Sequence, residues 1–231
     1  MKKALISIIG LLCTAVLTSA SASRPDTLRI LSVANSFGVD AVEQNLHDIA
    51  LADGHVLIIG NMYIGGCSLE RHYNNSVSGS TDYSYRKVGA DGILTKRPET
   101  TLDYSLRDEP WDIVIFHQAS PLCGLPETYE PFLTKLIAYA RAHTPKKSKI
   151  MINQTWAYAV DATHEKFGTY GHSQEKMYEA LCDAYSKAAK KHKLELIPSG
   201  TAVQNSRGTF NQDNVTRDGY HMQPWFYSFR C

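Results

Sequence analysis

The feature that most constrains the fold is an alternation of short apolar runs with segments of helical periodicity. Runs rich in Val, Ile and Leu predict buried strands at residues 28–34, 55–59, 112–116, 149–152 and 194–197. Apolar residues spaced three or four apart predict helices at residues 39–51, 127–143 and 173–192. Strands that alternate with helices are typical of a parallel sheet covered on both faces. We therefore predict an α/β fold, a three-layer α/β/α sandwich around a five-stranded parallel sheet.

The first 22 residues differ in composition from the rest of the chain. Lys2-Lys3 precedes an apolar or small run at residues 4–17, and the small residues Ala20-Ser21-Ala22 follow. This order is typical of a secretory signal peptide, whereas a bilayer span needs about 20 apolar residues. We expect cleavage after residue 22 and a single mature domain at 23–231, located in the periplasm or outside the cell. No later stretch is apolar enough to span a membrane, so we expect no membrane association after cleavage.

The charge balance argues against one class of partner. The chain has 24 Lys and Arg against 23 Asp and Glu, a net charge of +1. Removing residues 1–22 takes away two lysines and no acidic residue, so the net charge becomes −1. Such a chain lacks the basic field that drives sequence-independent binding to nucleic acid, and we expect no nucleic-acid partner.

Cysteine and histidine spacing does not indicate a metal site. Neither an H-E-x-x-H nor a C-x-x-C motif is present, and we expect no metal and no cofactor. Cys182 falls at helical spacing among apolar residues and is predicted to be part of the core. Cys67 and Cys123 can form a disulfide if their loops meet, and nothing marks Cys67 as an activated nucleophile.

Polar and glycine residues follow the first three predicted strands, where the ligand site of a parallel sheet lies. Ser36 follows the first strand and is either a nucleophile beside a helix amino terminus or simply a helix cap. Gly65-Gly66 follows the second strand and either donates an N–H to an oxyanion or forms an ordinary turn. Gln118 follows the third strand, where its side-chain amide is either an oxyanion donor or a satisfied loop group.

Two further segments complete the candidate site. Asp218 stands three residues before His221, a spacing that lets a carboxylate accept the Nδ1 proton and leaves Nε2 free to act as a base. Trp156 and Tyr158 follow the fourth strand and either form an aromatic wall for a sugar ring or pack under their loop. The polar, Tyr-rich residues 73–100 suggest an excursion over the site as one hypothesis.

Order and place make these separate patterns resemble the SGNH (GDSL-type) hydrolases over nearly all of residues 28–221. A branch of secreted bacterial SGNH proteins is similar in the segments Asn35-Ser36-Phe37, Tyr63 to Glu70, Trp111-Asp112, Gln118-Ala119-Ser120, Gln154 to Tyr158 and Thr216 to His221. The resemblance implies a flavodoxin-like fold with Ser36 as nucleophile, His221 as base and Asp218 orienting it. It also implies an oxyanion hole built from the Ser36 N–H, the Gly66 N–H and Gln118.

Three departures from this family pattern affect the interpretation. Asn35 stands where the family has Asp, and Gln118 replaces the usual Asn of the third block. Some carbohydrate acetylesterases of the superfamily also carry Gln there, which suggests sugar esters. Only ten residues follow His221, and Pro224 with four aromatic residues does not predict the closing helix expected of relatives.

We predict a secreted serine esterase that removes acyl groups, with acetyl on carbohydrate as the expected substrate. Asn35, Trp156 and Tyr158 are the residues that we expect to contact this small-molecule or glycan ester. A glycan-binding protein without catalytic activity is the alternative from another class, and a lipase or thioesterase is the alternative among enzymes.

Overall fold

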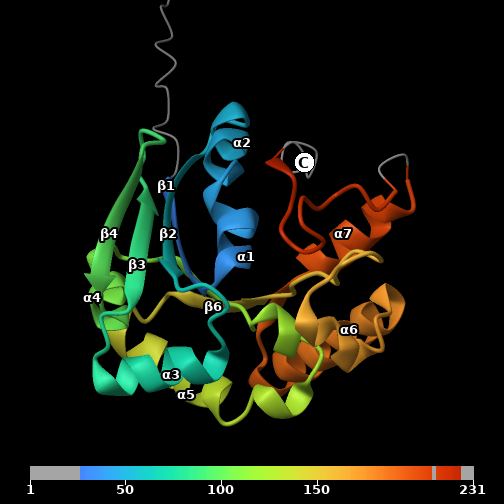
Figure 1. Ribbon diagram of the computed structural model, residues 1–231. Coiled ribbons are helices and arrows are strands. Elements are labelled where there is room, and N and C mark those ends of the chain that lie inside the picture. The colour runs from blue at the N-terminus through green and yellow to red at the C-terminus, as the bar shows by residue number, and fades with distance from the viewer. Residues whose placement is uncertain (1–26, 210–211, 225–231) are drawn as a thin grey trace, which may run out of the picture.

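The computed structural model describes residues 27–209 and 212–224 (Figure 1). The predicted signal peptide and the aromatic residues after position 224 lie outside the described residues. The centre of the molecule is one seven-stranded sheet with the order β4-β3-β2-β1-β5-β6-β7. The strands are β1 (Thr27–Ala34), β2 (Val56–Tyr63), β3 (Tyr83–Val88), β4 (Leu94–Thr100), β5 (Ile113–Phe116), β6 (Lys149–Asn153) and β7 (Glu195–Ile197).

The five predicted strands form a parallel sheet, as expected from their apolar runs. β1 pairs with β2 and β5, β5 pairs with β6, and β6 pairs with β7, all in parallel. Leu31 and Val33 of β1 point to one face and Ile30 points to the other, because successive side chains of a strand alternate. The α/β class and the central parallel sheet are therefore confirmed.

The prediction of five strands misses two strands, which form one hairpin. β3 and β4 form an antiparallel pair, and β3 extends the sheet beyond β2. Tyr83, Tyr85 and Val88 of β3 are buried, whereas β4 is exposed along all but its last residue. The Tyr-rich region therefore lengthens one edge of the sheet instead of crossing its carboxyl end, as Figure 1 shows.

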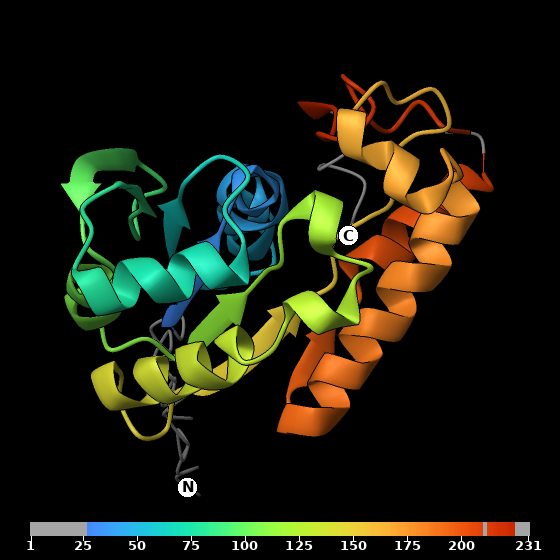
Figure 2. The ribbon, with the colours of Figure 1, turned by 60° about the horizontal axis from the view of Figure 1, so that its bottom comes forward.

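Helices cover both faces of the sheet. They are α1 (Ser36–Gly38), α2 (Leu46–Ala52), α3 (Leu69–Ser78), α4 (Leu102–Asp108), α5 (Phe132–His143), α6 (Gln174–His192) and α7 (Ser199–Arg207), with a π-helical turn η1 (Val39–Glu43) between α1 and α2. Short 3₁₀ turns are η2 (Ser120–Leu122), η3 (Pro126–Thr128) and η4 (Glu165–Tyr170). The segment α1-η1-α2 lies on one face, and α3, α4, α5 and α6 lie on the other (Figures 1 and 2).

The predicted helix boundaries differ in accuracy. The helix expected at 173–192 is α6, which begins after Ser173, whose hydroxyl accepts a hydrogen bond from the Lys176 N–H. The helix expected at 127–143 begins only at Phe132, after the cap residue Pro131. The helix expected at 39–51 is interrupted between η1 and α2. None of the helices in the described ranges is long and apolar enough to cross a membrane.

Candidate active site

Ser36 is the first residue of α1, directly beyond the carboxyl end of β1. The cap of this helix is Asn35, whose Oδ1 accepts a hydrogen bond of 3.1 Å from the Phe37 N–H. Ser36 is partly exposed, and its hydroxyl makes no hydrogen bond with another described residue. Because Asn35 caps the helix, capping does not account for Ser36, and its hydroxyl is available for chemistry.

Asn35 also connects the first three loops of the site. Its side chain is 1% exposed, and its Nδ2 donates to the carbonyl oxygens of Cys67, at 3.1 Å, and Gln118, at 3.3 Å. Both ends of the amide are thus bonded to protein. The prediction that Asn35 contacts substrate is wrong, because the side chain is turned inward and fixes the loops around Ser36.

The second loop places a glycine N–H at the site. The Cys67 N–H donates to the Ile64 carbonyl at 3.2 Å, which closes a tight turn with Gly66 at a φ of 62°. Glycine adopts this left-handed conformation without the steric cost that other residues incur. Gly66 is exposed, and its N–H has no acceptor within the part of the chain that the structure describes. This N–H is therefore available to an oxyanion, as the sequence suggests.

Gln118 has a different role from the one predicted. Its side chain is fully buried, and its Oε1 accepts hydrogen bonds from the N–H groups of Leu69, at 3.1 Å, and Ala119, at 2.8 Å. Its Nε2 donates to the carbonyl and the hydroxyl of Thr128, at 3.2 and 3.1 Å. The amide is satisfied within the protein, so Gln118 stabilises its loop and is not placed as an oxyanion donor.

Asp218 and His221 form a hydrogen-bonded pair. Oδ2 of Asp218 lies 2.6 Å from Nδ1 of His221, and Oδ1 accepts from the backbone N–H groups of His221 and Tyr220, at 2.7 and 3.1 Å. Burial acts to raise the pKa of Asp218, but these hydrogen bonds outweigh it and lower the pKa below its usual range. Because an ionised carboxylate only accepts, Nδ1 carries the proton. Nε2 is buried and has no hydrogen-bond partner among the described residues.

Two contacts from the α1-η1 segment hold the His221 loop beside α1. The His221 ring meets the edge of Phe37, the residue after Ser36, with 5.8 Å between ring centroids. Oδ2 of Asp40 accepts a hydrogen bond of 2.9 Å from the Met222 N–H. Asp40 is four residues after Ser36 on the same helical segment, so the first and last parts of the site meet. Phe37 and Asp40 are positioning residues that the sequence patterns did not reveal.

The predicted aromatic wall is not exposed. Trp156 and Tyr158 are both fully buried. Trp156 stacks on Phe37 with ring centroids 4.3 Å apart, and its Nε1 donates to the Tyr220 carbonyl at 2.7 Å. The Tyr158 hydroxyl lies 2.9 Å from the hydroxyl of Ser120. The prediction that these rings contact a sugar is wrong, and the alternative of packing beneath the loop is the one observed.

Cysteine chemistry does not contribute to this site. Cys67 and Cys123 are buried free thiols, so the disulfide considered for them is absent. Burial raises the pKa of each thiol to about 12, which keeps both protonated at neutral pH. Within residues 27–209 and 212–224, no group of three or more His, Cys, Asp or Glu side chains is placed to hold a metal ion.

Solved structures identify the class of fold. A putative SGNH hydrolase from Slackia heliotrinireducens matches with a TM-score of 0.58 and 21% identity, covering 89% of this chain and 95% of that one. The esterase EstA from Pseudoalteromonas matches with a TM-score of 0.54 and 11% identity, covering 87% and 91%. The chain therefore has the α/β fold of SGNH hydrolases. No curated protein sequence matches it.

The family follows from the sequence match and from a closer relative. The family model DUF4886, described as a domain of unknown function, matches residues 29–230. A DUF4886 family protein from Bacteroides uniformis has a crystal structure that matches with a TM-score of 0.84 and 44% identity, covering 87% of this chain and 82% of that one. The protein belongs to the DUF4886 family.

Proposed function

We propose that this protein is a serine esterase with Ser36 as nucleophile and His221 as general base. The observation that carries the proposal is that Nε2 of His221 has no hydrogen-bond partner among the described residues. Asp218 holds Nδ1 of the same ring. The loop of His221 is bonded through Met222 to Asp40, in the helical segment that begins at Ser36. A serine is activated for acyl transfer by a free imidazole nitrogen with a carboxylate behind the ring, and the Asp218–His221 pair supplies both of these groups. The SGNH hydrolase fold supports this assignment.

The reaction proceeds by two acyl transfers. His221 Nε2 removes the Ser36 hydroxyl proton as Oγ attacks the ester carbonyl, and it returns that proton to the departing alcohol. Water then attacks the acyl-enzyme with His221 again as base, which releases the acid and restores Ser36. Asp218 keeps Nδ1 protonated in both steps and stabilises the imidazolium.

Backbone groups provide the oxyanion hole in this proposal. The N–H groups of Ser36 and Gly66 have no acceptor within the described residues, and both lie at the carboxyl end of the sheet. Since the Gln118 amide is occupied by Leu69, Ala119 and Thr128, the hole contains two backbone donors instead of the three predicted. Fixed N–H donors stabilise a tetrahedral oxyanion without reorganisation during the reaction.

A short acyl group, acetyl on carbohydrate, remains the substrate that we propose. The Phe37 ring packs edge-on against His221 and stacks on Trp156, and this aromatic packing next to the proposed base supports a small acyl group over a long chain. The signal-peptide pattern of residues 1–22 supports export, and we propose that the enzyme acts in the periplasm or outside the cell.

Hydrolysis of p-nitrophenyl acetate tests the mechanism. We expect activity in the unmodified protein and a loss of about 10³-fold or more in Ser36→Ala and in His221→Ala. Ser78→Ala and His55→Ala are matched controls away from the site and should retain full activity. A fluorophosphonate probe should add its mass to Ser36 alone. Equal rates in all five proteins would remove the proposal, and retained glycan binding without any hydrolysis would favour a binding protein.

A second comparison addresses the substrate. We expect release of acetate from acetylated xylo-oligosaccharides and no comparable release of palmitate from p-nitrophenyl palmitate. The reverse preference would replace the carbohydrate esterase with a lipase or thioesterase while leaving the Ser36 mechanism intact.

A further inference from the structure

The His221 loop, residues 212–224, has little regular structure of its own. It consists of turns and bends that are closed by an isolated antiparallel bridge between Thr216 and Met222. Asp218 and His221 lie inside this closed turn. Because an irregular segment does not fix its own position on the protein, contacts with other elements determine where the proposed base lies.

The loop after β6 provides the surface against which the His221 loop packs. Nε1 of Trp156 donates to the Tyr220 carbonyl at 2.7 Å, and the Ala159 N–H donates to the Gly219 carbonyl at 2.7 Å. A side-chain carbon on Gly219 would lie 2.9 Å from Ala162, so glycine, with a φ of 89°, permits this close approach. The two loops are therefore bonded to each other at the two residues that precede the proposed base.

Asp213 joins the His221 loop to the same surface at another point. Its Oδ2 accepts a hydrogen bond of 2.7 Å from the Val160 N–H. Nε2 of Gln174, the first residue of α6, lies 3.0 and 3.1 Å from the two carboxylate oxygens and also donates to the Tyr158 carbonyl at 3.0 Å. The Asp213 carboxylate thus connects its own loop with the loop after β6 and with the start of α6.

Arg207, the last residue of α7, pairs with this carboxylate. Its Nε lies 2.8 Å from Oδ1 of Asp213, and its Nη2 donates to the Ala157 carbonyl at 2.9 Å. The Arg207 side chain is 5% exposed and the Asp213 side chain is 25% exposed. We call Asp213 and Arg207 the α7 ion pair. Because a buried guanidinium without a counter-charge is costly, the pair ties the His221 loop firmly to α7 and to the loop after β6.

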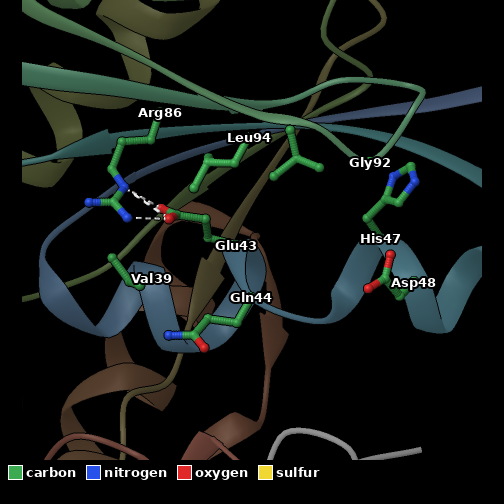
Figure 3. Close-up of a pocket in the computed structure, with 9 residues that line it drawn as sticks. Val39, Glu43, Gln44, His47, Asp48, Arg86, Gly92 and Leu94 are labelled. Carbon is green, nitrogen blue, oxygen red and sulfur yellow. Dashed lines mark hydrogen bonds and ion pairs between the residues drawn. The ribbon is translucent and has the colours of Figure 1, made fainter.

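A second buried ion pair holds the helical segment that begins at Ser36. Glu43 lies in η1, and both of its carboxylate oxygens accept hydrogen bonds from Nε of Arg86 in β3, at 2.9 and 2.7 Å (Figure 3). The Glu43 side chain is 4% exposed. We call Glu43 and Arg86 the β3 ion pair. Asp40, in the same η1 turn, accepts the Met222 N–H, so the β3 ion pair fixes the segment to which the His221 loop is bonded.

The His221 loop is therefore held from two sides, by the α7 ion pair and by the β3 ion pair. We propose that the four residues of these pairs are positioning residues, which keep His221 where its Nε2 can serve Ser36. This role rests on the proposed function. Local hydrogen bonds order the Asp218–His221 pair itself, so the two ion pairs set its position and not its internal geometry. A misplacement of about 1 Å can cost about 10²-fold in rate.

Rates expressed per reactive serine test this role. Titration to completion with a fluorophosphonate counts the active sites, because unfolding lowers the number of sites whereas a misplaced base lowers kcat at each site. Asp213→Ala and Glu43→Ala should each lower kcat on p-nitrophenyl acetate about 10- to 100-fold per site, with KM nearly unchanged. The pH profile should keep its shape, because the Asp218–His221 hydrogen bond is local. Asp213→Asn and Glu43→Gln keep an acceptor oxygen and should retain more activity than the alanine variants.

Asp108→Ala is the matched control for the loss of a partly buried carboxylate. The Asp108 side chain is 19% exposed and pairs with Lys87 at the sheet edge, 2.7 Å away. This variant should also lose stability to urea, while its kcat per site stays that of the unmodified protein. A value in Asp213→Ala or Glu43→Ala that is no lower than in Asp108→Ala would overturn the positioning role of that ion pair. If an alanine variant does not fold, its amide variant takes its place in this comparison.

Hydrogen exchange separates this role from the proposed function. In Asp213→Ala we expect faster exchange of the Ala159 amide, which donates to the Gly219 carbonyl, and unchanged protection of Val33 in β1. Ser36-dependent activity that the ion-pair variants leave intact would overturn the positioning role alone. Activity in the unmodified protein no higher than in Ser36→Ala would overturn the proposed function. An Ala159 amide that exchanges no faster in Asp213→Ala would show that the ion pair does not hold the loop.

Discussion

His221 and Asp218 contact each other through a 2.6 Å Nδ1–Oδ2 hydrogen bond on a loop whose own backbone N–H groups also bind the carboxylate. The pair is thus organised locally, and its position relative to Ser36 is set by separate contacts from Phe37, Asp40 and Trp156. Local order and long-range placement can therefore be tested by different substitutions.

Asp218→Asn tests the orienting carboxylate. An amide cannot fix the Nδ1 proton or stabilise the imidazolium, so we expect kcat on p-nitrophenyl acetate to fall about 10²- to 10⁴-fold. The Asp218 side chain is 38% exposed, and the midpoint of urea unfolding should change little. Full activity in this variant would show that the Asp218–His221 pair has no catalytic role.

Gln118→Ala distinguishes a structural amide from an oxyanion donor. The substitution leaves the buried Leu69 and Ala119 N–H groups without their acceptor, and we expect the free energy of unfolding to fall by about 3 kcal/mol. Urea unfolding monitored by tryptophan fluorescence measures this loss. Unchanged stability together with a large fall in kcat would restore Gln118 to the oxyanion hole.

Asn35→Asp introduces the residue that SGNH hydrolases usually have at this position, and we predict that it lowers the stability of this protein. The carboxylate would face the Cys67 and Gln118 carbonyls in a site that is 1% exposed, at a cost of about 3 kcal/mol or more. Such burial raises the folded-state pKa of the new acid, so the variant should regain stability as pH falls, because its neutral form can donate. Urea unfolding at neutral and mildly acidic pH measures both effects, and equal stability of the two proteins would contradict them.

Asp108→Asn tests the pH dependence of stability at the sheet edge. Burial acts to raise the pKa of Asp108, but hydrogen bonds from Lys87, at 2.7 Å, and Tyr85, at 2.8 Å, lower it overall. A lowered folded-state pKa stabilises the fold above the unfolded pKa, and this stabilisation is lost as pH falls through the folded value. The variant should be less stable by about 1 kcal/mol at neutral pH, with the difference closing below about pH 4.

The exposed Asp183→Asn is the control for this titration. Its carboxylate pairs with Lys187 at the surface, where ion pairs contribute little. It should change stability only slightly at either pH. A constant difference between Asp108→Asn and the unmodified protein at all pH values would contradict the prediction.

Thiol labelling tests the buried cysteines. The thiols of Cys67 and Cys123 have a pKa raised to about 12 by burial, so iodoacetamide should modify neither in the native protein at neutral pH. Both should react after denaturation without prior reduction, as peptide mapping will show. Rapid native labelling of Cys67 would indicate an activated thiol, and a need for reduction would indicate a disulfide.

The sequence predicts the central strands well because strands of a covered parallel sheet are written as runs of apolar residues, which can be recognised without knowing their neighbours. The antiparallel hairpin escapes prediction for the opposite reason. Residues 94–100 contain Lys, Arg, Pro and Glu and are mostly exposed, so their strand state depends on pairing with β3. Only the alternation of Tyr83 and Tyr85 indicates a strand in this region.

The site shows the same division between local and long-range information. The Asp218–His221 hydrogen bond is set by a three-residue spacing, and the sequence predicts it correctly. The direction of the Gln118 side chain depends on Thr128, which reaches it through the 3₁₀ turns that follow β5. The burial of Trp156 depends on Phe37, more than a hundred positions away. No local pattern contains either contact.

The bond between Asp40 and Met222 joins residues 182 positions apart. The proposed nucleophile Ser36 is therefore synthesised well before the proposed base His221. A growing or truncated chain can already contain the residues of the sheet and much of its core while it lacks both His221 and Asp218. In the proposed mechanism, hydrolysis requires that the chain has been synthesised through Met222 and that this contact has formed, so esterase activity reports the pairing of Asp40 with Met222.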